Sequence, residues 1–142
     1  MSIRVARFDR RVACAAFALV AGACSTGHQL ALVEALQEYN DGLRWQRMAE
    51  ASQFVAPAQR NEFAARVELL QDVRVTDYQV GAVKLNGDNR AYVLVSIDWY
   101  ALRTGQLNQT VVQQTWDRKG ERWEVSDQRW VRGKSFPLFA AR

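Results

Sequence analysis

The sequence predicts an α+β domain, with N-terminal helices packed on a curved antiparallel sheet of about four strands. Two observations carry this prediction. Between Gln29 and Leu70, apolar residues recur every three to four positions, which is the period of an amphipathic helix. Between Val73 and Ser126 they recur at every second position, as in a strand with one buried face. There is no internal repeat or low-complexity run, so residues 29–142 are assigned to a single domain.

Three helices are expected before the sheet. The first buries Leu32, Leu36 and Tyr39 and ends at the cluster Asn40-Asp41-Gly42, whose residues favour caps and turns. The second is expected from Leu43 to about Phe54, because the residue before Pro57 is disfavoured in a helix. Its expected inner face comprises Trp45, Met48, Ala49 and Ser52. A third helix begins at Pro57, and its expected buried residues are Phe63, Val67 and Leu70.

Four strands are expected after Asp72. In residues 73–85 the apolar phase changes face, which predicts a β-bulge near Gly81. The segment 86–89 has hairpin-turn composition, and residues 91–101 alternate most clearly between apolar and polar. Residues 109–118 and 121–126 form a second hairpin if Lys119-Gly120 is its loop, which would place Trp116 opposite Trp123 and Gln114 opposite Val125. The last residues, 129–142, are expected to add a short strand or an apolar strap.

The N-terminal 23 residues have the order of a secretory signal: four arginines, the apolar stretch Val12 to Val20, and small residues before Cys24. The apolar stretch is too short to span a bilayer. The segment Ala21-Gly22-Ala23-Cys24 resembles the lipobox of bacterial lipoproteins, although Ala21 stands where that family usually has leucine. The resemblance implies cleavage before Cys24 and acylation of this cysteine. The alternative is an ordinary secretory signal cut near Ala23, which would leave a free thiol.

Cleavage would change the charge and the compartment. The whole chain has a formal net charge of +4, but residues 24–142 carry 15 basic and 14 acidic side chains, so a nucleic-acid partner is not expected. Residues 24–28 are assigned to a lipidated tether. By resemblance to lipoprotein sorting in Gram-negative bacteria, Ser25 after the cysteine implies the outer membrane, facing the periplasm. The membrane, through the lipid anchor, is then the first expected partner.

The order of elements and the tryptophan-containing hairpins resemble the nuclear transport factor 2-like superfamily, a cystatin-like cone in which helices pack into a bent sheet. Small bacterial envelope lipoproteins of undetermined function are also similar. They share Arg44-Trp45 near a helix end, the strand Val73-Arg74-Val75-Thr76-Asp77-Tyr78 and a closing tryptophan hairpin. Enzymes of the cone superfamily place an acid or base inside the cone. The resemblance therefore makes Asp77, Tyr78 and Asp98 the candidate polar groups of a cavity.

Other chemistry finds little support in the sequence. His28 is the one histidine, and after cleavage no thiol except Cys24 is left, so neither a metal site nor a Ser-His or Cys-His nucleophile is expected. No catalytic residue and no cofactor are assigned. The five tryptophans (Trp45, Trp99, Trp116, Trp123 and Trp130) would either fill the core or line a ligand pocket.

The polar phase of residues 91–101 suggests a different kind of site. Tyr92, Leu94 and Tyr100 lie on the face opposite the apolar set and form the candidate interaction surface. The sequence therefore predicts a non-catalytic envelope lipoprotein that serves interaction or assembly, with an envelope protein or a second copy as partner. The alternatives are a cone domain that binds a small ligand, and an enzyme similar to polyketide cyclases or isomerases.

Overall fold

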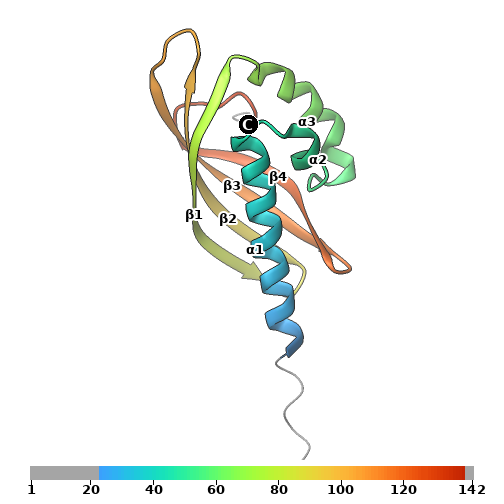
Figure 1. Cartoon of the computed structure of the whole chain (residues 1–142). Coiled ribbons are helices and arrows are strands. Elements are labelled where there is room, and N and C mark those ends of the chain that lie inside the picture. The colour runs from blue at the N-terminus through green and yellow to red at the C-terminus, as the bar shows by residue number, and fades with distance from the viewer. Residues whose placement is uncertain (1–22, 140–142) are drawn as a thin grey trace, which may run out of the picture.

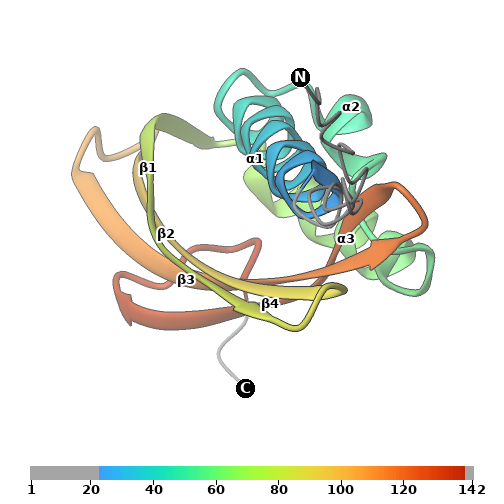
Figure 2. The same ribbon diagram turned by 90° about the horizontal axis from the view of Figure 1, so that it is seen from below.

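The computed structural model describes residues 23–139, with side chains from residue 26 onward. Three helices, α1 (Ala23–Arg44), α2 (Met48–Ser52) and α3 (Arg60–Val67), precede four strands (Figure 1). The strands are β1 (Val73–Asn86), β2 (Arg90–Ala101), β3 (Leu107–Lys119) and β4 (Arg122–Gly133), paired antiparallel in the order β1-β2-β3-β4. The sheet is curved, and the three helices lie on its concave side (Figure 2). The predicted fold class is confirmed.

Helix α1 is longer than the sequence pattern predicts. It begins at Ala23, so the backbone of the segment assigned to the tether is helical, and it continues through Asn40-Asp41-Gly42. The predicted helix end at this cluster is wrong because Asn40 is a core residue. Its side chain is 1% exposed, and its amide donates a 2.8 Å hydrogen bond to the carbonyl oxygen of Leu36. Gly42 permits close packing, since a Cβ there would lie 2.8 Å from the Cβ of Ala51.

The prediction for the second helix is also wrong. Helix α2 covers only Met48–Ser52, because the chain leaves the helical conformation at Gln46, which has a φ of 58°. The helix restarts with a different phase, so Ala51 is buried while Trp45 is 62% exposed. The guanidinium carbon of Arg44 lies 5.0 Å from the centre of the Trp45 ring. In the third helical segment, Phe63 and Leu70 are buried as predicted, although residues 57–59 and 68–70 are 3₁₀ turns.

The sheet confirms most of the strand predictions. The register of β1 against β2 shifts between Val80 and Val83, which confirms the bulge predicted at Gly81, and a second shift lies between Val75 and Asp77. The predicted register of the last hairpin is wrong: Trp116 lies opposite Val125, and Trp123 lies opposite Arg118. Gly120, with a φ of +64°, is the first loop residue rather than the second, so the pairing moves by two positions.

The segment after β4 acts as an apolar strap. Strand β4 extends to Gly133, and the next six residues bury Phe136, Leu138 and Phe139 in the same core as the helices. The Phe136 ring lies 5.3 Å from the ring of Trp99 in an edge-to-face arrangement. The indole N–H of Trp99 donates to the hydroxyl of Thr110, 2.9 Å away. The middle of the concave side of the sheet is therefore covered by the helices and by this strap.

The outer face of the sheet and the polar groups of the interior

The three residues of the candidate interaction surface lie on the convex face of the sheet. Tyr92, Leu94 and Tyr100 alternate along β2 with a buried set (Ala91, Val93, Val95, Ile97 and Trp99) that faces the helices. Leu94 is 37% exposed, and both tyrosines are half-buried. In the register of β2 with β3, Tyr100 lies opposite Leu107, which is 65% exposed. None of the described helices packs on this face (Figure 2).

The structure does not gather Asp77, Tyr78 and Asp98 into one cavity. Asp98 shares the convex face and accepts a 2.9 Å hydrogen bond from the side-chain amide of Gln109. Asp77 lies on the edge strand β1, where its half-exposed carboxylate is 3.1 Å from the guanidinium of Arg44. Tyr78 pairs in register with the buried Ile97 and therefore points to the concave side, where its hydroxyl donates to the carboxylate of Asp41 at 3.1 Å.

The pKa of the Tyr78 hydroxyl is raised in the folded protein. Burial, followed by the hydrogen bond to Asp41 and the negative charge of that carboxylate, raises the pKa of Tyr78 to about 12. A tyrosine in the unfolded chain titrates near 10, so the neutral hydroxyl is favoured by the fold. Its contribution to stability is complete below pH 10 and is lost as the pH rises from about 10 to about 12.

Because the pKa of Tyr78 is raised, the stability of the wild type and of Tyr78→Phe should depend differently on pH. Between pH 10 and 12, the free energy of unfolding of the wild type should fall more steeply than that of Tyr78→Phe. Denaturant unfolding at a series of pH values measures both slopes, and Tyr39 is present in both proteins. Parallel slopes for the two proteins would contradict the assigned shift.

A polar cluster that sequence reasoning missed lies between α1 and the concave face. Gln114 is fully buried, and its amide donates to the Asn40 side chain at 3.0 Å. The carbonyl oxygen of the same amide accepts from the indole N–H of Trp116 at 3.1 Å. Tyr39 is also buried, and its hydroxyl accepts a 2.7 Å hydrogen bond from Gln128. The available signal was that Gln114 shares the apolar phase of β3 with Val112 and Trp116.

Burial dominates the chemistry of this cluster. It raises the pKa of the Tyr39 hydroxyl far above its usual range, and the hydrogen bond from Gln128 opposes the shift only in part. Tyr39 is therefore neutral at physiological pH and acts as a hydrogen-bonding group. Two buried atoms of the described residues have no hydrogen-bond partner: the side-chain oxygen of Gln128 and the indole nitrogen of Trp130.

The cavity beside this cluster is small. It has a volume of about 60 Å³, lies between α3 and β4, and is lined by Phe63, Val125, Gln128 and Leu138 among others. Pockets for drug-sized ligands measure about 300–1,000 Å³, whereas one water occupies about 30 Å³ of liquid. Over the middle of the sheet, the concave side is filled by large side chains, including Trp116, Tyr39, Phe136 and Phe139. The cavity has the size of one or two water molecules.

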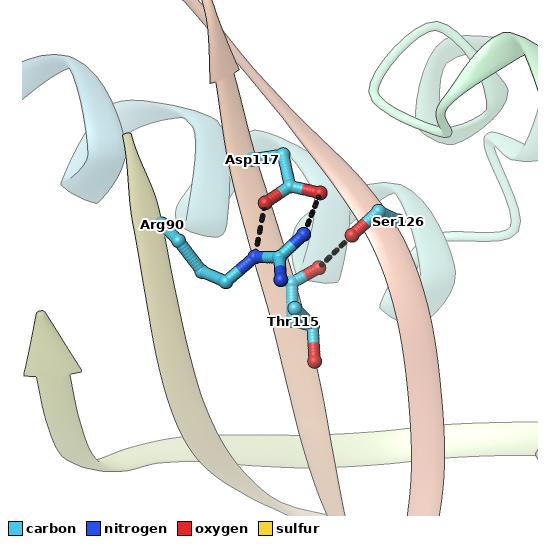
Figure 3. A network of polar contacts seen from close by, with 4 residues as sticks. All are labelled: Arg90, Thr115, Asp117 and Ser126. Atoms are coloured by element: carbon cyan, nitrogen blue, oxygen red, sulfur yellow. Dashed lines mark hydrogen bonds and ion pairs between the residues drawn. The ribbon is translucent and has the colours of Figure 1, made fainter. Parts of the chain in front are cut away.

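A charged network crosses the convex face near the hairpin that joins β1 and β2 (Figure 3). The Arg90 guanidinium forms two contacts with the Asp117 carboxylate, at 2.6 and 3.0 Å. These contacts hold the pKa of Asp117 below its usual range. On the neighbouring strand, the Ser126 hydroxyl donates to the carbonyl oxygen of Thr115 at 3.3 Å. These contacts connect β2, β3 and β4, and the bidentate pair of Arg90 and Asp117 helps to align β2 with β3.

Residues 23–139 contain no group of three or more histidine, cysteine, aspartate or glutamate side chains that could hold a metal ion. None of the described helices is both long and apolar enough to cross a membrane.

The comparison with solved structures identifies the fold. A SEC-C motif containing protein from Rhodopseudomonas palustris matches with a TM-score of 0.60 and 11% identity, over 76% of this chain and 91% of that one. A protein of unknown function with a cystatin-like fold from Nostoc punctiforme has a TM-score of 0.51 and 10% identity, covering 72% and 88%. A candidate isomerase from Rhodopseudomonas palustris has a TM-score of 0.50 and 18% identity, covering 76% and 92%.

Together with the geometry, these similarities define an α+β protein of cystatin-like fold. At 10–18% identity they establish the fold and not an activity. No protein-family model and no curated protein sequence matches the chain.

Proposed function

We propose that this protein is a non-catalytic cell-envelope lipoprotein, anchored through Cys24 in the outer membrane and facing the periplasm. In this proposal, the convex face of its sheet binds another envelope protein or a second copy of the chain. The anchor is supported by the signal-like segment 1–23 and by the lipobox-like residues that end at Cys24. The described residues form a hydrophobic core of their own. In this proposal the anchor and the binding face are separate parts of the molecule.

One observation carries the choice of a binding function over catalysis. Over the middle of the sheet, where a cone domain would hold a substrate, the concave side is filled, and the cavity between α3 and β4 measures about 60 Å³. The convex face instead carries Tyr92, Leu94 and Tyr100, none of them covered by a described helix. Tyrosine offers a large contact area with little loss of side-chain entropy, and it is enriched at the centres of protein interfaces.

Substitutions on the convex face test this proposal. Tyr92→Ala and Tyr100→Ala should each weaken association by about 2 kcal/mol, roughly 30-fold in Kd, if they form the centre of the interface. The thermal midpoint should change little, because neither side chain belongs to the hydrophobic core. In-cell photocrosslinking from the convex face identifies the partner, and sedimentation of the purified chain measures self-association.

Trp45→Ala is the matched control, because Trp45 is an aromatic residue, 62% exposed, at the end of α1. It should leave association unchanged. Equal losses for Trp45→Ala and Tyr100→Ala, or no loss for either tyrosine variant, would reject the convex face as the binding surface.

A small-ligand function is the second candidate, and one observation favours it. The unpartnered side-chain oxygen of Gln128 belongs to a residue that lines the cavity between α3 and β4. A buried acceptor without a partner costs about 1–3 kcal/mol, so a bound water or a small donor group would stabilise it. An organic ligand would need α3 or the strap to move, and ligand-dependent protection of these segments from hydrogen exchange would support this function.

A further inference from the structure

Helix α1 carries a stripe of residues whose C-terminal end contacts β1. Its members are spaced three or four residues apart, so they lie on one side of the helix: Leu30, Val33, Gln37, Asp41 and Arg44. The last two contact β1, since Asp41 accepts from Tyr78 and Arg44 pairs with Asp77. The first two residues of the stripe are exposed to solvent: Leu30 is 65% and Val33 48% exposed.

Strand β1 has a matching set of open apolar residues. Val80, Val83 and Leu85 pair in register with the buried residues of β2, so they point to the concave side. They are nevertheless 40%, 48% and 42% exposed. Helix α1 and strand β1 run antiparallel from their contact at Asp41 and Tyr78, so the two sets lie along the same end of the molecule. We call these five residues the α1–β1 patch: Leu30, Val33, Val80, Val83 and Leu85.

This end of the molecule also holds the start of α1 and two hairpins (Figure 1). The indole N–H of Trp123 donates to the carbonyl oxygen of His28 at 2.9 Å, which fixes the early turns of α1 against the β3–β4 hairpin. The Arg118 guanidinium lies 3.3 Å from the His28 ring and donates to the carbonyl oxygen of Asp88 in the β1–β2 hairpin at 2.9 Å. The helix start and both hairpins therefore form one surface.

That surface is basic. Residues 84–90 and 117–122 hold five basic and three acidic side chains, a local net charge of +2, although residues 24–142 as a whole are close to neutral. The basic residues are Lys84, Arg90, Arg118, Lys119 and Arg122. Apolar residues bordered by lysine and arginine are the combination with which peripheral proteins bind anionic lipid surfaces.

We infer that this end of the molecule docks on an anionic phospholipid surface, with the α1–β1 patch against the lipid and the two hairpins at the headgroups. The inference rests on the proposed anchor, because Cys24 lies six residues before Leu30, about 9 Å along a helix. Acyl chains on Cys24 would hold the patch next to the bilayer. The convex face lies on the far side of the sheet from α1, so a docked molecule leaves it free for a partner.

The test places a single fluorophore on the acylated protein. Residues 25–142 contain no cysteine, so Leu85→Cys provides one thiol in the α1–β1 patch. Leu102→Cys is the matched control, because Leu102 is 49% exposed and lies in the β2–β3 hairpin at the opposite end of the sheet. Each labelled protein is reconstituted into vesicles of phosphatidylethanolamine and phosphatidylglycerol that contain a bromine-labelled phospholipid as quencher.

Docking predicts strong quenching at Leu85→Cys and little at Leu102→Cys, with weaker quenching at Leu85→Cys when phosphatidylcholine replaces phosphatidylglycerol. Equal quenching at the two positions, or none at Leu85→Cys, would overturn the inference. Quenching that does not depend on phosphatidylglycerol would overturn the role of the basic hairpins. Fluorophore self-quenching that grows with the protein-to-lipid ratio would assign the patch to a second copy instead.

The wild type separates this inference from the proposed anchor. An acylated Cys24 takes no fluorophore, and the wild type should float with the vesicles. If it is labelled and does not float, the anchor is wrong. Docking is then decided by adding the labelled Cys24→Ser, Leu85→Cys protein to the same vesicles, where quenching supports docking and its absence overturns it.

Discussion

Cells that produce the Cys24→Ala variant should incorporate no fatty-acid label into this chain and should accumulate the uncleaved precursor. In the proposed anchor the sulfur of Cys24 is the atom that is acylated, and alanine offers no nucleophile in its place. The wild type should carry the label. Metabolic labelling with a fatty-acid probe, followed by a gel that separates precursor from mature chain, measures both effects.

Separation of membranes from soluble proteins tests the same prediction in a second way. Two acyl chains already suffice for stable anchoring, so a fully acylated wild type should stay with the membranes in high salt. Cys14→Ala is the matched control, because Cys14 lies within the segment that the proposed cleavage would remove. It should behave as the wild type. Equal labelling of Cys24→Ala and the wild type would reject the lipoprotein assignment.

Ile97→Ala should lower the free energy of unfolding by about 2–5 kcal/mol. Ile97 is 1% exposed and lies in the middle of β2, in the core formed by the helices, the concave face and the strap. Removing three of its carbon atoms loses their transfer free energy and leaves a space that the surrounding side chains fill only in part. Chemical denaturation with constant m-values measures the difference.

Ser96→Ala tests the assignment of the faces. Ser96 is the neighbouring residue and points to the convex face, so its loss should change stability by no more than about 0.5 kcal/mol. A similar loss for both variants would mean that the two faces of β2 are not distinguished by burial as the structure has them.

Residues 91–101 show why most of the sheet could be predicted. The alternation of apolar and polar residues in this segment predicts which side chains are buried. The turns lie at glycines with positive φ: Gly87, Gly105 and Gly120. The helices were predicted less well because Asn40-Asp41-Gly42 has the composition of a turn. In the fold, Asn40 pairs with Gln114, 74 residues away in the sequence, and a local pattern contains no information about such a partner.

The interior site was beyond sequence reasoning for a related reason. Gln114 looks like an ordinary strand residue, and Gln128 lies beyond the strand predicted for residues 121–126. Only the register of β3 with β4, which a bulge shifts, places them opposite each other. The placement of Asp77 was open for the same reason, since it follows a bulge in β1. The sequence did define the residues of the convex face, because Tyr92, Leu94 and Tyr100 lie in the strand with the clearest alternation.

The two bulges in β1 have a consequence for solubility. Strand β1 has 14 residues, forms one edge of an open sheet, and pairs on one side only, with β2. A long, regular edge of this kind would recruit strands from other chains and seed aggregation. The register shifts after Val75 and Val80 divide the edge into short segments, and Lys84 adds a charge near its end. Substitutions that straighten β1 should therefore promote aggregation before they reduce thermal stability.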